Sequence, residues 1–213
     1  MDDDDLMIEK TLVMLDMQDE MNCHVDADWM SRGREWYRAI WIECAELMDH
    51  YGGWKWWKHA APDLEQAMLE LVDIWHFGLS LRLVAGGTRR DIAAALVAEW
   101  NAPPATRGFL VEVESLAVAA LDGRRFAVGS VANLVAACGR GFDDLHRTYV
   151  AKNVLNVFRQ DHGYRSGSYV KTWDGREDNV VLAELLGTLD SDAVDFRERV
   201  YAALERVYVT LER

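Results

Sequence analysis

The chain has 213 residues and a formal net charge of −13 at pH 7, and half of its residues are hydrophobic. This composition excludes a disordered chain, and the acidic balance argues against a nucleic-acid-binding surface, which is normally basic. No apolar run reaches the ~18 residues that a membrane span needs, and three sparse cysteines lack metal-ligand spacing. We therefore expect one folded domain over residues 1–213, in the cytoplasm, without nucleic-acid or membrane partners.

Helical periodicity continues through nearly the whole chain, and strand-type alternation is almost absent. In chain order, the pattern predicts helices around 7–21, from Ser31 to Gly52, from Asp63 to Gly86, from Thr88 to Pro103, and over about 106–121, 126–139, 143–161, 180–187 and 191–211. Residues 163–179 contain three glycines and are expected to form a structured loop. The predicted fold class is all-α, a compact bundle of about eight to nine helices.

Capping residues support several of these helix starts. Asp63 with Gln66 resembles a capping box, and Thr88 with an acid three residues later marks another start. Ser31 and Ser191 are the expected N-caps of the second and last helices.

Two pairs of carboxylates, Glu43 with Glu46 and Glu70 with Asp73, lie within apolar helical patterns. Residues three apart share one helix face, so two such helices packed together bring four acids into one place between core helices. Clustered buried charges need a compensating cation, and oxygen ligands favour Mg²⁺ or Mn²⁺. The alternative interpretation is that both pairs are surface acids on the solvent-exposed faces of amphipathic helices. Two pairs on neighbouring helices, both flanked by apolar residues, favour a metal site for a phosphorylated ligand, in which one of the acids could serve as general base.

Polar residues near these acids allow several interpretations. His76 follows Asp73 by three residues, but a di-iron bundle needs two such Glu-x-x-His pairs, so iron is disfavoured. Gln18 and Asn22 lie on an apolar stripe, and their amides suit the edge of a pyrimidine. The alternative is an amide pair satisfied by neighbouring backbone.

Two further segments are rich in ligand-binding side chains. Trp54-Lys55-Trp56-Trp57-Lys58 could stack a base and contact phosphate, or close the end of a helix pair, and the sequence leaves this open. The predicted helix over 143–161 carries one continuous polar stripe with two Asn, which are poor helix formers. Together with Arg165, Tyr169 and Lys171, that stripe indicates a wall that binds anions and hydroxyls.

The paired acids resemble the signature of the all-α nucleoside triphosphate pyrophosphatases, and the full series of motifs resembles the dimeric dUTPase family. The blocks that carry this resemblance are Gln18-x-x-x-Asn22, Trp54-Lys55-Trp56-Trp57-Lys58, Glu70-x-x-Asp73-x-x-His76-Phe77, Tyr149-x-x-Lys152-Asn153-x-Leu155-Asn156-x-x-Arg159, and Gly163-Tyr164-x-x-Gly167-x-Tyr169-x-Lys171-x-Trp173-x-Gly175-x-Glu177-Asp178-Asn179. They occur in family order. The chain is short for the family, which suggests trimmed insertions and a bacterial or phage-infected cell as its setting.

The resemblance implies hydrolysis of dUTP, and of dUDP as a further substrate, to dUMP by a metal-bound water. Glu43, Glu46, Glu70 and Asp73 would be the catalytic residues and would hold two or three Mg²⁺ ions. It also implies a homodimer and a deoxyuridine nucleotide as ligand. The implied substrate-binding residues are Gln18, Asn22, Trp56, Trp57, Lys58, His76, Phe77, Lys152, Asn156, Arg159, Tyr164, Tyr169 and Lys171. Two alternatives stay open: the same scaffold acting on another pyrimidine nucleotide such as dCTP, and a non-catalytic nucleotide-binding protein.

Overall fold

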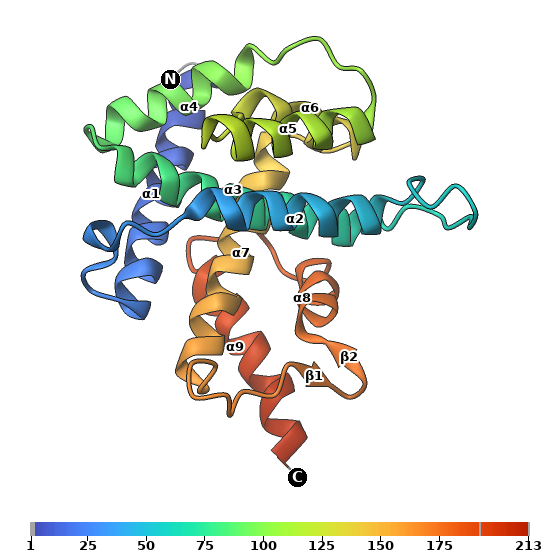
Figure 1. The fold of residues 1–213 in the computed structure, drawn as a ribbon. Coiled ribbons are helices and arrows are strands. Elements are labelled where there is room, and N and C mark those ends of the chain that lie inside the picture. Colours follow the sequence, from blue (N-terminus) through green and yellow to red (C-terminus); the bar gives the residue numbers. More distant parts are fainter. Residues whose placement is uncertain (1–2, 192, 213) are drawn as a thin grey trace. The chain divides into compact units, whose positions relative to one another are not determined.

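The fold is helical, as the computed structural model shows for residues 3–191 and 193–212 (Figure 1). The described residues form nine α-helices, two short 3-10 helices and one two-stranded sheet, which confirms the all-α prediction. The helices are α1 (Asp3–Val25), α2 (Trp36–Tyr51), α3 (Leu64–Ala85), α4 (Arg89–Asn101), α5 (Phe109–Gly123), α6 (Val128–Ala137), α7 (Phe142–Asp161), α8 (Asp178–Leu186) and α9 (Phe196–Tyr208). The 3-10 helices are η1 (Trp29–Arg32) and η2 (Val209–Glu212). None of the helices described is both long and apolar enough to cross a membrane.

The contacts of the described residues divide the chain into two compact units, and the boundary lies inside α7, after His146. The first unit contains α1 to α6 and the start of α7, up to His146. The second unit contains the rest of α7, both strands, α8 and α9. That the chain forms a single domain stays a prediction.

Helix α3 is the centre of the first unit. It packs against α1, α2, α4 and α6, and it is buried on nearly every side because its sequence is apolar almost all round. Helix α2 buries only one stripe, formed by Ile40, Cys44 and Leu47, at spacings of four and three residues. These two helices lie side by side and run in opposite directions (Figure 1), so functional groups on the facing sides of α2 and α3 are held by the core.

Two of the predicted caps are present. The Asp63 side chain accepts a hydrogen bond from the backbone N–H of Gln66 at 3.1 Å, at the start of α3. At the start of α4, Thr88 Oγ1 accepts the backbone N–H of Asp91, also at 3.1 Å. These contacts satisfy helix donors that would otherwise have no intrahelical partner.

The other two predicted caps were wrong. Ser31 lies inside η1, where its hydroxyl bonds the Asp28 carbonyl, and Gly33 then turns the chain in the left-handed region (φ 62°). That turn separates Ser31 from α2, which begins at Trp36. Ser191 likewise precedes a further turn, and α9 begins at Phe196.

The second unit encloses a cluster of aromatic rings. Phe158 packs edge-on against Trp173 and Tyr208, with ring centroids 5.9 and 5.4 Å apart, and Tyr169 stacks on Tyr208 at 5.5 Å. The predicted loop over 163–179 contains a hairpin of β1 (Thr172–Trp173) and β2 (Arg176–Glu177), followed directly by α8. Its two turn residues, an Asp-Gly pair, both have positive φ, which is the chemistry of a tight hairpin turn.

A half-buried histidine, His146, makes the stability of the first unit depend on pH. Burial, together with the positive charge of Lys10, lowers the pKa of His146 from 6.5 to about 4, and its Nε2 has no hydrogen-bond partner among the described residues. The unfolded chain therefore binds a proton that the folded chain does not, at pH values between these two pKa values. This contribution to stability is present above the unfolded pKa and is lost as the pH falls towards 4.

We expect His146→Leu to reduce the loss of unfolding free energy between neutral pH and pH ~5 by roughly 1–2 kcal/mol relative to wild type. Urea unfolding across this range would measure the difference. His59→Leu is the matched control, because His59 is exposed. An equal pH dependence of wild type and His146→Leu would contradict the assignment.

Candidate active site

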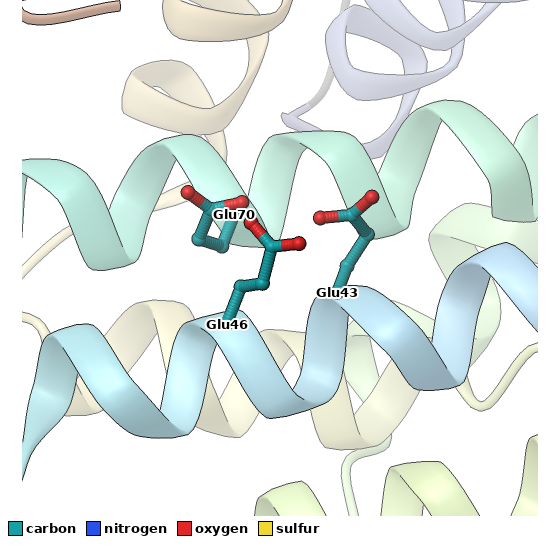
Figure 2. Close-up of side chains that lie close together, drawn as sticks. All are labelled: Glu43, Glu46 and Glu70. Atoms are coloured by element: carbon teal, nitrogen blue, oxygen red, sulfur yellow. The ribbon is translucent and has the colours of Figure 1, made fainter.

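Three carboxylates meet between α2 and α3. Glu43 and Glu46 come from α2 and Glu70 from α3, and each offers an oxygen within 4.8 Å of the others. Figure 2 shows the three side chains in the space between the paired helices, with those of Glu46 and Glu70 directed towards each other. Glu70 is buried, Glu43 is half-buried and Glu46 is exposed, so the cluster is open to solvent on the Glu46 side.

Burial and the charges of the neighbouring carboxylates both act on Glu43, and burial has the larger effect. Burial and the charges of Asp73, Glu70 and Glu46 together raise the pKa of Glu43 to about 8, and a hydrogen bond with Glu70 adds to this rise. In the absence of a cation, Glu43 therefore keeps a proton at neutral pH. An oxygen-only donor set that holds a proton in this way fits a hard divalent cation, which would replace the proton and neutralise the acids.

Asp73, the fourth predicted ligand, lies one turn beyond Glu70 on α3 and is half-buried. Its charge raises the pKa of Glu43 more than the charge of Glu70 or of Glu46 does. It is not part of the group of three whose oxygens lie within 4.8 Å of one another. The structure thus places Asp73 within electrostatic reach of the cluster, and its role as a ligand stays a prediction.

A histidine that was not among the predicted site residues, His50, lies beside the acids. Its Nε2 is 3.5 Å from Glu70 Oε1. His50 follows Glu46 by four residues on α2, so the same helix spacing that pointed to the acids would have placed His50 on their face.

A ring of buried polar side chains joins α1 to α3. Gln18 Nε2 donates to Asn22 Oδ1 at 3.1 Å, Asn22 Nδ2 donates to Ser80 Oγ at 2.9 Å, and the Ser80 hydroxyl donates to the His76 carbonyl. His76 Nδ1 lies 2.7 Å from Gln18 Oε1. Because that oxygen can only accept, His76 carries a proton on Nδ1.

The ring shows how the Gln18 and Asn22 amides are held, and their contact with a base stays a prediction. Each amide bonds neighbouring side chains, Gln18 with Asn22 and His76, and Asn22 with Ser80. A fixed chain of donors and acceptors orients each amide, which is what recognition of a base edge requires. Ser80 was not predicted, although it follows His76 by four residues on the same face of α3.

Three aromatic side chains pack together next to the polar ring, starting with Phe77 of α3. Phe77, directly after His76, stacks on Trp36 of α2 with ring centroids 6.2 Å apart, and Trp36 packs edge-on against Trp29 at 5.8 Å. Phe77 is partly exposed, so one part of its ring is available to a ligand. Trp36 and Trp29 were not among the predicted site residues.

The tryptophan segment lies in an exposed loop between α2 and α3, beyond the end of that helix pair (Figure 1). Trp56 and Trp57 are 84 % and 62 % exposed, and their rings contact each other at 5.4 Å. Lys58 is exposed as well. The loop therefore does not plug the helix pair, and the substrate contacts predicted for Trp56, Trp57 and Lys58 stay predictions.

In the second unit, Arg159 is held by an aspartate that had no predicted role. Its Nε and Nη2 donate to the two carboxylate oxygens of Asp178, both at 2.8 Å, and its Nη1 donates to Asn156 Oδ1 at 3.1 Å. Tyr169 donates its hydroxyl proton to the same carboxylate at 2.8 Å. Burial alone would raise the pKa of Asp178, but the hydrogen bonds and charge of Arg159 outweigh it and hold this pKa below its usual value.

The remaining predicted residues of this unit are arranged around the same network. Lys152 is buried, and its Nζ donates to Asn179 Oδ1 at 2.9 Å. Lys171 forms an exposed ion pair with Glu177 at 3.2 Å, and Tyr164 is 49 % exposed near the Arg159 guanidinium. The structure thus brings the predicted polar stripe together, with Asp178 and Asn179 at its centre.

The chain is helical, and clustered carboxylates lie between two of its paired helices. This arrangement is that of the all-α nucleoside triphosphate pyrophosphatases. Within that class, the chain belongs to the dUTPase family, because the family model described as dUTPase matches residues 10–164. This confirms the resemblance that the motifs indicated and assigns dUTP diphosphatase activity, the hydrolysis of dUTP, to the chain. The matched range includes all four predicted acids and ends before Tyr169 and Lys171. A comparison with curated protein sequences found no match.

Proposed function

We propose that the chain hydrolyses dUTP to dUMP and pyrophosphate with Mg²⁺ bound by Glu43, Glu46, Glu70 and Asp73, and so limits the entry of uracil into DNA. The observation that carries this proposal is the meeting of three carboxylates between α2 and α3, with the Glu43 pKa raised to about 8 by burial and by the charges of its neighbours. The donor set suits two or three Mg²⁺ ions, and Mn²⁺ as a substitute. Cleavage of dUDP is part of the same proposal.

When bound, Mg²⁺ neutralises phosphate charge and lowers the pKa of a coordinated water. The residues of the chain orient the substrate and move the proton. A carboxylate of the cluster accepts the proton of the attacking water, and the ring of Gln18, Asn22 and His76 holds the base with Phe77 against its face.

The test is metal-dependent pyrophosphate release from a panel of dUTP, dUDP, dCTP, dTTP and UTP, with each nucleotide product identified. Release of pyrophosphate and dUMP from dUTP, abolished by chelator and restored by Mg²⁺, would support the proposal. Preference for dCTP would keep the mechanism and change the substrate. Turnover of dUTP that persists with chelator would contradict the metal assignment.

We expect Gln18→Leu to raise the KM for dUTP about tenfold while kcat changes less, because the apolar side chain cannot make the hydrogen bonds that join Gln18 to His76 Nδ1 and Asn22 Oδ1. Steady-state kinetics would show this split. Thr11→Val is the control, since Thr11 is also buried in α1 but its hydroxyl bonds the Met7 carbonyl of its own helix. A Gln18→Leu variant with wild-type KM would exclude the ring from base binding.

We also propose that the chain is a homodimer. Helix α5 exposes three apolar residues at helical spacing, Val111, Val118 and Leu121, which are 37 %, 61 % and 53 % exposed. Such a face is unfavourable in water and suits a symmetric interface between two copies. Sedimentation should give a dimer for wild type and a monomer for Val118→Lys, and a monomeric wild type would overturn this proposal.

A further inference from the structure

A second concave site lies in the first unit, away from the acid cluster. It is a cleft of ≈ 590 Å³ bounded by the last turns of α3, by Glu99 of α4 and by the connection between α5 and α6. Leu81 and Val84 contribute to its apolar wall, and Arg82, Arg124 and Arg125 bring positive charge. Its volume lies within the range typical of small-molecule sites.

The charge of this cleft is opposite to that of the chain. Its lining has three arginines and one carboxylate, Glu99, which is already bound by Arg82 Nη2 at 2.6 and 2.7 Å. Arg124 and Arg125 are exposed, and neither has a carboxylate partner within residues 3–191 and 193–212. In a chain of net charge −13, two neighbouring unpaired cations in one cleft form a local anion-attracting field.

Arg124 is held in a conformation that disfavours its side chain. It caps the C-terminus of α5 in the left-handed region, with φ 47° and ψ 41°. Glycine usually occupies this position, because a residue with a Cβ is disfavoured there. The guanidinium carbon lies 5.1 Å from the centre of the Tyr37 ring, so the ring supports the flat face of the group and its N–H edges can bind an anion.

We propose that this cleft binds a small phosphate monoester of mononucleotide size. Two arginines match the charge of a phosphate dianion and can bind its oxygens in pairs, and the apolar wall accommodates the organic part of the ligand. The site is distinct from the acid cluster. Arg82 follows Glu70 by twelve residues on α3, which is roughly 18 Å along the helix.

Calorimetric titration of the metal-free full chain with dTMP, AMP and inorganic phosphate tests the proposal. The decisive variant is Arg124→Gly with Arg125→Ala. Glycine suits the left-handed backbone at position 124, so this variant removes both guanidinium groups without adding strain. The control removes two other exposed arginines of the same unit, in Arg107→Ala with Arg140→Ala.

We expect the cleft variant to bind the monoesters at least about tenfold more weakly than wild type, and the control variant to bind them as wild type does. Inorganic phosphate that binds as tightly as the nucleotides would support the anion site and assign recognition to the phosphate alone. Equal affinities of wild type and the cleft variant for all three probes, or no binding by wild type, would overturn the proposal. Turnover of dUTP by the cleft variant, measured separately, should stay at the wild-type rate and so keeps this test independent of the proposed function.

Discussion

The Glu43→Gln variant is expected to lose dUTP turnover by about 100-fold or more while its metal-free form becomes more stable at pH near 8. The loss follows because an amide oxygen carries no charge and binds a hard cation weakly. The gain follows because the same change removes one member of a cluster of mutually repelling carboxylates. A residue that is needed for activity and that destabilises the fold without its ligand is typical of a built cation site.

The sign of the pH dependence follows from the raised pKa of Glu43. The folded-state pKa is about 8 and the usual value is 4.5, so the folded chain holds this proton more tightly than the unfolded chain does. Below pH 4.5, Glu43 is protonated in both the folded and the unfolded chain, so it does not change the free energy of unfolding. As the pH rises from there towards 8, the unfolded chain loses this proton first, and the free energy of unfolding falls. After allowance for solvent screening and for coupling to the neighbouring acids, we expect Glu43→Gln to recover about 2 kcal/mol at the upper end of this range.

Urea unfolding of the metal-free proteins at several pH values, and then with Mg²⁺, would measure both effects. Mg²⁺ should raise the melting temperature of wild type and raise that of Glu43→Gln much less, because binding to the folded state stabilises it. Glu114→Gln is the matched control, since Glu114 is exposed on α5 and lies outside the cluster. Undiminished turnover in Glu43→Gln would remove Glu43 from the metal site.

Much of the acid cluster could be predicted from sequence because its geometry is local. The spacing of Glu43 and Glu46 fixes them on one face of α2, and Glu70 faces them because α3 directly follows α2 and packs against it. The helix starts at Asp63 and Thr88 are local as well, since each cap depends on one side chain and one backbone N–H.

The contacts that sequence did not predict depend on tertiary structure. Asn22 bonds Ser80, which is 58 residues away, and the partner of Arg159 is Asp178, beyond a hairpin that did not show strand-type alternation. Two strands of two residues each are too short to produce a periodic pattern. The N-caps predicted at Ser31 and Ser191 were wrong although serine is a good capping residue, because a turn lies between each serine and the helix that follows it.

Asp178→Ala is expected to reduce the free energy of unfolding of the second unit by about 3–5 kcal/mol. The variant leaves the Arg159 guanidinium, whose side chain is only 12 % exposed, without its carboxylate, and it removes the acceptor of the Tyr169 hydroxyl. An uncompensated buried charge is far more costly than the loss of a surface ion pair. Glu184→Ala is the control in the same unit, because its pair with Arg176 is exposed, and we expect a loss below about 1 kcal/mol.

Urea unfolding of both variants, followed by far-UV circular dichroism, would compare their free energies of unfolding. Similar losses for Asp178→Ala and Glu184→Ala would contradict a structural role for the buried pair.

Replacing both partners, in Arg159→Met with Asp178→Leu, separates structure from substrate binding. Removing a buried pair completely is much less costly than breaking it, so this double variant should recover most of the stability that Asp178→Ala loses. If Arg159 also contacts the phosphates of dUTP, the folded double variant will still have a raised KM. A stable double variant with wild-type KM would assign Arg159 to the fold alone. The substrate contacts predicted for this unit would then be Lys152, Asn156, Tyr164, Tyr169 and Lys171.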